Sequence, residues 1–172
     1  MPSQHPLDLE RIDVLAAGDD HVLLTVDDPD VTLLVLPDHS AVLYDVGSID
    51  RSDLEGHVLT PVLRREGVRC LDTIFLSHAD LDHVSALDAV VSRHGPRRIV
   101  TTERVWETMT LPPGPEVVVV RRGDRVELSA GVTAEVLAPG PGNEGSDNDR
   151  SLVLLIEGGG SRVLLTGDLE EA

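Results

Sequence analysis

The residues best suited to chemistry lie in one short stretch, Ser77 to His83, which reads Ser-His-Ala-Asp-Leu-Asp-His. It carries four potential metal ligands: His78, Asp80, Asp82 and His83. Imidazole nitrogen and carboxylate oxygen suit zinc, manganese or iron, and two of each are more donors than one open catalytic ion requires. We therefore expect two divalent ions, zinc or manganese, about 3.5–4 Å apart and sharing these ligands. The alternative is a solvated acidic loop with two exposed histidines.

The elements on either side of this stretch predict how it is positioned. An apolar run predicts a strand over 71–77, and apolar residues at helical spacing predict a helix from about Asp82 to His94. A further strand over 98–101 would complete a βαβ unit with parallel pairing. His78, Asp80 and Asp82 would then follow the carboxyl end of a strand, and His83 would come from the first turn of the helix.

Two distant carboxylates also follow apolar strands. The run Leu-Tyr-Asp-Val-Gly at 43–47 ends an apolar strand with Asp45 and a glycine, and Asp168 ends the run Leu-Leu-Thr-Gly-Asp at 164–168. Functional groups of α/β proteins gather at the carboxyl ends of strands, so both acids are candidates for the same site. Each one alone is also explained as turn chemistry, because Asp and Gly commonly end strands.

Taken together, these motifs resemble those of the metallo-β-lactamase-fold hydrolases. The resemblance rests on Asp45-Val46-Gly47, the signature His78-x-Asp80-x-Asp82-His83, and Gly167-Asp168. Asp80 stands where most of that superfamily has His, and this variant is similar to the soluble hydrolase domain of the ComEC type, attached to bacterial DNA-uptake channels. One departure is Ala-Gly-Asp-Asp at 17–20, where ComEC-type domains usually carry a Gly-Gln-Gly turn. The resemblance implies an α/β fold, an αββα sandwich of two similar halves.

The ligands suggest a dinuclear mechanism. One ion would be held by His78 and Asp80 and the other by Asp82 and His83, with Asp168 bridging them, so that hydroxide forms near neutral pH and attacks a phosphodiester. The residues expected to act in catalysis are Asp82, Asp168 and Asn148.

Three polar residues have supporting roles in this interpretation. Asp45 is expected to orient a ligand histidine rather than to bind metal itself. Asn148 and Ser151 lie where much of the superfamily supplies another histidine, and they would contact phosphate or metal-bound water. Their alternative role is simple turn capping.

The rest of the chain reads as one domain over 1–172. A β meander is expected from Ile12 to Tyr44, and a helix from Arg51 to Glu66 that Pro61 kinks or restarts. A short helix over 103–109 is followed by strands at 116–120, 125–128, 132–137, 151–157 and 162–166. Because the resembled fold continues beyond this point, its second half looks truncated, and the chain is either a fragment or an abbreviated protein. An open edge at the last strand would permit self-association.

Composition limits the possible partners. The net charge is −17, all 14 basic residues are Arg, and aromatic residues make up 2% of the chain. Binding to DNA or another phosphodiester should therefore be weak and salt-sensitive, without an aromatic stacking platform. The sequence shows neither a signal peptide nor a transmembrane segment, which predicts a soluble, cytoplasmic chain. Cys70 is expected to be a small buried residue rather than a nucleophile.

Three functions remain open. The first is a metal-dependent phosphodiesterase or nuclease. The second is a hydrolase of the same fold that acts on another ester, a lactone, a lactam or a thioester. The third is an inactive relative whose metals are loosely held.

Overall fold

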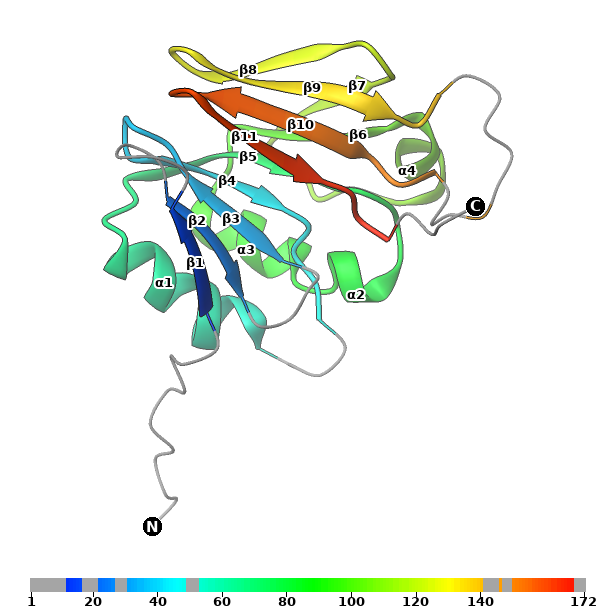
Figure 1. The fold of residues 1–172 in the computed structure, drawn as a ribbon. Helices are drawn as coiled ribbons and strands as arrows, with labels where there is room; N and C mark the ends of the chain where they lie inside the picture. The colour runs from blue at the N-terminus through cyan, green and yellow to red at the C-terminus, as the bar shows by residue number, and fades with distance from the viewer. Residues whose placement is uncertain are drawn as a thin grey trace.

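The computed structural model describes residues 12–16, 22–26, 31–48, 53–140, 146 and 150–168. Within this part of the chain, two β-sheets pack face to face, and the helices cover the other face of the larger sheet (Figure 1). These are the helix layer and the two sheet layers of the expected α/β sandwich. None of the helices described is long and apolar enough to cross a membrane.

The larger sheet holds seven of the described strands in chain order. They are β1 (Ile12–Ala16), β2 (Val22–Val26), β3 (Thr32–Val35), β4 (Ser40–Tyr44), β5 (Cys70–Phe75), β6 (Arg98–Thr102) and β7 (Glu116–Val120). The pairs from β1 to β4 are antiparallel, which confirms the predicted meander. The pairs from β4 to β7 are parallel, which confirms the predicted βαβ unit. The carboxyl ends of β4, β5 and β6 therefore meet at one edge of the sheet.

The smaller sheet is antiparallel throughout, in the order β11-β10-β9-β8. Its strands are β8 (Arg125–Ser129), β9 (Val132–Ala138), β10 (Val153–Gly158) and β11 (Ser161–Leu165). A turn at Gly159-Gly160 joins β10 to β11, and both glycines have positive φ angles of 56° and 82°. This turn joins the strands expected at 151–157 and 162–166 into an antiparallel hairpin.

Alternating residues on the central strands explain the layering. Ile74 and Leu76 pack into the cluster beneath the helices, whereas Phe75, between them, packs into the cluster between the sheets. All three side chains are fully buried. A strand covered on both faces needs a continuous apolar run, which is the pattern that precedes the candidate ligands in the sequence.

The helix predicted from Asp82 to His94 is two helices, α2 (Leu81–Val84) and α3 (Leu87–His94). The break is caused by a segment distant in the sequence, because the backbone N–H of Ala86 donates to the carbonyl of Val46 and that of Val46 donates to the carbonyl of His83. The loop after β4 thus satisfies backbone groups that a continuous helix would have paired internally. This loop also fixes α2, which carries His83.

The other helices agree more closely with those expected from the sequence. A π-helical turn at Glu55–Leu59 leads into α1 (Thr60–Arg65), so Pro61 restarts the helix as expected. Helix α4 (Glu103–Thr108) follows β6 directly, and the hydroxyl of Thr102 accepts a hydrogen bond from the N–H of Val105. The expectation for Cys70 was wrong, since it is exposed at the first position of β5, before the strand enters the core.

Candidate metal centre

The carboxyl ends of β4 and β5 bring two segments of the predicted site together. Tyr44 pairs with Phe75 across these parallel strands, and the N–H of Asp45 donates to the carbonyl of Phe75 at 2.9 Å. Asp45, the residue after β4, therefore lies beside Ser77, two residues after β5. Its φ of 56° is in the left-handed region, where Asp and Asn are tolerated better than most residues.

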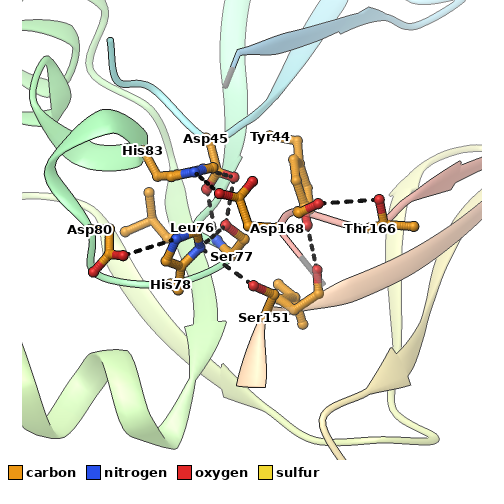
Figure 2. A network of polar contacts seen from close by, with 12 residues as sticks. Tyr44, Asp45, Leu76, Ser77, His78, Asp80, His83, Ser151, Thr166 and Asp168 are labelled. Atoms are coloured by element: carbon orange, nitrogen blue, oxygen red, sulfur yellow. Dashed lines mark hydrogen bonds and ion pairs between the residues drawn. The ribbon is translucent and has the colours of Figure 1, made fainter. Parts of the chain in front are cut away.

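Two histidines face one another at this edge. The ring centroids of His78 and His83 are 4.0 Å apart, and the two residues are 3% and 1% exposed. One ligand atom from each histidine and one carboxylate oxygen of Asp168 all lie within 4.8 Å of one another. The structure thus brings together three of the predicted ligands from three separate segments: the end of β5, α2 and the turn after β11 (Figure 2).

The carboxylate of Asp45 orients both rings. Its Oδ2 accepts from Nδ1 of His83 at 2.9 Å and from the hydroxyl of Ser77 at 2.6 Å, while its Oδ1 accepts from the Ser77 backbone N–H at 2.7 Å. Because the Ser77 hydroxyl donates to Asp45, it must accept the bond that joins it to Nδ1 of His78 at 2.8 Å. Both histidines therefore carry their proton on Nδ1, held by Asp45 directly or through one hydroxyl, as expected for a residue that orients ligands.

This tautomer leaves the Nε2 atoms for a metal ion. Nε2 of His78 is buried and has no hydrogen-bond partner among the described residues, and the carboxylate of Asp80 is 3.6 Å away. Nε2 of His83 lies 3.3 Å from Oδ2 of Asp168. Two imidazoles and a carboxylate are ligands that zinc, manganese and iron accept, so the residues present fit a divalent ion.

Asp168 reaches the histidines through a close turn. A Cβ at Gly167, whose φ is 54°, would lie 3.0 Å from the Ser77 Cβ and 3.0 Å from the Tyr44 hydroxyl oxygen, so only glycine fits. The Asp168 side chain is 42% exposed, unlike the histidines. A cavity of about 160 Å³ opens beside it, and its walls include Asp45, His83 and residues 164–168.

The other predicted residues are placed as follows. Asp80 lies at the edge of the group with its side chain 54% exposed, and Asp82 is half-buried on α2, outside the three-residue cluster. Ser151 is fully buried, and its hydroxyl oxygen is 3.4 Å from Nδ1 of His78. Asn148 lies outside the described residues. The roles assigned to these residues remain predictions.

Two residues were not recognised as part of the site from the sequence. Ser77 links Asp45 to His78, and its place directly before the first histidine was the only signal for it. Tyr44 donates from its hydroxyl to the carbonyl of Leu152, which ties the larger sheet to the segment that carries Ser151. Burial raises the pKa of Tyr44 well above its ordinary value, so the phenol stays protonated and remains a donor.

Comparison with known proteins agrees with this geometry. A family model described as the metallo-beta-lactamase superfamily matches residues 24–172. The chain is 33% identical over 123 residues to ComE operon protein 3 of Bacillus subtilis, a match that covers 66% of this chain and 16% of that protein. It is 28% identical over 138 residues to Recombination protein 2 of Haemophilus influenzae, covering 80% of this chain and 17% of that protein. The resemblance to proteins of the ComEC type is thereby confirmed.

Solved structures share the fold. The apo state of the chemotaxis sensor ODP from T. denticola matches with a TM-score of 0.60 and 23% identity, over 83% of this chain and 58% of that one. The chain spans about a sixth of the length of the curated relatives named above. With the match over residues 24–172, the two sheets and the Asp45-oriented histidine pair, the chain belongs to the metallo-β-lactamase superfamily.

Proposed function

We propose that this chain is a metal-dependent hydrolase domain that cleaves phosphodiester bonds. The observation that carries the proposal is the hydrogen-bonded path from His78 through Ser77 and Asp45 to His83. Packing alone does not require such a path. Its effect is to hold both imidazoles in the tautomer whose Nε2 atoms can bind a cation. Most members of the superfamily are metal-dependent hydrolases.

The residues of this site would bind metal, orient the ligands or hold the surrounding segments in place. His78 and Asp80 would hold one ion, and His83 and Asp82 a second, with the carboxylate of Asp168 between them. Bound divalent ions would supply Lewis acidity, lowering the pKa of water toward neutrality and stabilising the charge that develops at phosphorus. Asp45 keeps the histidines in place, and Tyr44 holds the loop that carries Ser151 against them. Because Asp80 stands beside His78, the donor set is rich in oxygen, and manganese competes with zinc.

The phosphodiester substrate is supported by the relatives rather than by the site. They are named for competence and recombination, processes in which DNA is handled, and their similarity extends over most of this chain. Ser151 would contribute a hydroxyl from the buried edge of the site. Asn148 would add a side-chain amide.

Elemental analysis tests the site first. Protein purified without chelator should contain about two equivalents of zinc or manganese, and His78→Ala and Asp82→Ala should both lose metal. His57→Ala is the matched control, because His57 also bonds a carboxylate at 2.9 Å but is 76% exposed. A folded wild-type protein without metal would contradict the proposal.

Hydrolysis tests the substrate. The metal-loaded protein should cleave bis(p-nitrophenyl) phosphate and a single-stranded oligonucleotide, and the activity should disappear in His78→Ala but persist in His57→Ala. Cleavage of a lactone or a lactam without cleavage of either phosphodiester would refute the substrate while leaving the metal site intact.

A further inference from the structure

A second cavity, of about 600 Å³, lies at the carboxyl ends of β6 and β7. Its walls come from the start of α4, the turn after β7, the two residues that follow β9, and Arg150. The charged residues that line it are Arg104, Arg121, Arg122, Arg150, Glu103 and Glu107. Four of the chain's 14 basic residues thus gather around one hollow of a protein whose net charge is −17. An excess of positive charge in so acidic a chain is not explained by solubility.

Arg150 provides an independent sign of a ligand. Its Nε is buried and has no hydrogen-bond partner among the described residues. A buried donor on a charged group is costly to leave unpaired, and a guanidinium is planar and suited to paired bonds with phosphate oxygens. The Nε–H of Arg150 needs a hydrogen-bond acceptor, and an anion in the cavity would supply one.

The arginines at the other end of β6 are already neutralised. Arg97 and Arg98 both pair with Asp72, at 2.7 and 3.5 Å, and these contacts add to the packing of β5 against β6. By contrast, no carboxylate of the described residues forms an ion pair with Arg121 or Arg122, which are both exposed in the cavity wall. Of these two Arg-Arg pairs, the one at 121–122 remains able to bind an external anion.

The cavity adjoins the metal centre in the fold. Arg150 directly precedes Ser151, whose hydroxyl oxygen is 3.4 Å from Nδ1 of His78. The strand that leads into the cavity, β6, pairs with β5, which leads into His78. In Figure 1, α2 and α4 follow the same edge of the larger sheet. A chain of phosphates could therefore cross from one site to the other.

We propose that this arginine cavity binds phosphate groups of a nucleic-acid strand, next to the phosphodiester that the metal centre cleaves. The identity of the strand as substrate rests on the proposed function, whereas the anion binding does not. Arg121 and Arg122 would contact phosphates reached from solvent, and Arg150 a phosphate closer to the histidines. This local site would allow an acidic protein to bind DNA, with the weak and salt-sensitive affinity expected from its net charge.

The test measures binding without catalysis. Fluorescence anisotropy of a labelled single-stranded oligothymidylate is recorded with the intact chain in EDTA, over a series of salt concentrations. Arg121→Ala/Arg122→Ala should weaken binding about tenfold. The slope of log K against log[salt] should become shallower by about 0.7 for each phosphate that the variant no longer neutralises. Arg150→Gln should also weaken binding of the oligothymidylate. If that variant does not fold, Arg121→Ala/Arg122→Ala still tests the inference.

Arg162→Ala is the matched control. Arg162 is 76% exposed on β11 and pairs with Glu157, away from the cavity, so its removal should leave the affinity unchanged. Equal affinity in wild type and in the double variant, an equal loss in Arg162→Ala, or no salt-dependent binding by the wild type would each overturn the inference.

Cleavage and binding, measured side by side, separate the two proposals. If the metal-loaded wild type cleaves no phosphodiester but the arginine variants still lose binding, the proposed function fails and the anion site stands. If cleavage occurs and the arginine variants bind normally, the cavity inference fails alone.

Discussion

Replacement of Asp45 by Asn tests the hydrogen-bonded path in the metal centre. Asp45 is 1% exposed and accepts three hydrogen bonds, from the Ser77 N–H, the Ser77 hydroxyl and Nδ1 of His83. Asn has nearly the same shape and also tolerates the left-handed backbone at this position, so the exchange changes chemistry with little steric effect. With one acceptor oxygen instead of two, its amide N–H₂ would face the other two donors. His83 would then have to move its proton to Nε2, the atom that should bind metal.

The size of the effect follows from these contacts. Loss of a residue that orients a ligand histidine typically weakens metal affinity 10- to 100-fold, or by about 1.4–2.7 kcal/mol. The metal-free protein should also be destabilised by about 1–3 kcal/mol, because two of the three donors lose their acceptor. The disappearance of one buried charge offsets part of that cost.

Competition with a chromogenic zinc chelator measures the affinity, and denaturant unfolding of the metal-free protein measures the stability. Asp53→Asn is the matched control, because Asp53 also contacts a histidine Nδ1 at 2.9 Å, but at a site where its side chain is 53% exposed. Unchanged zinc affinity in Asp45→Asn, or an equal loss in Asp53→Asn, would refute the assigned role of Asp45.

Three further results are expected. Burial raises the pKa of Tyr44 well above 10, so on raising the pH the unfolded chain loses this proton before the folded chain does. The free energy of unfolding should therefore keep its full Tyr44 contribution below about pH 10 and fall above it. Tyr44→Phe should flatten that fall in unfolding experiments on metal-free protein, and since Tyr44 is the only tyrosine, the phenolate absorbance reports it directly. Gly47→Ala should cost about 1–3 kcal/mol and release zinc in the chelator assay, because its Cβ would collide with the backbone carbonyl of Asp82. Gly95→Ala, at a φ of 53° with open space around it, should cost about 1–2 kcal/mol in denaturant unfolding while zinc affinity stays unchanged.

Much of the fold could be read from local patterns. The apolar run before Ser77 predicts a buried strand because both faces of β5 are covered, and the run after His83 predicts the helical segment that returns to β6. The single helix expected there was wrong, because its break depends on hydrogen bonds from Val46, which is distant in the sequence. The exposure of Cys70 was missed for a similar reason, since periodicity does not mark where a strand enters the core.

The sequence by itself determined the candidate ligands, because packing rarely requires histidines and carboxylates directly after apolar strands. Only the tertiary structure decided how they meet. The path from Asp45 through Ser77 to His78, the contact of Tyr44 with the carbonyl of Leu152, and the arginine cavity all join segments that are far apart along the chain. The physical reason is that spacing records which face of an element is buried, whereas hydrogen bonds and charges between elements depend on which strands lie side by side.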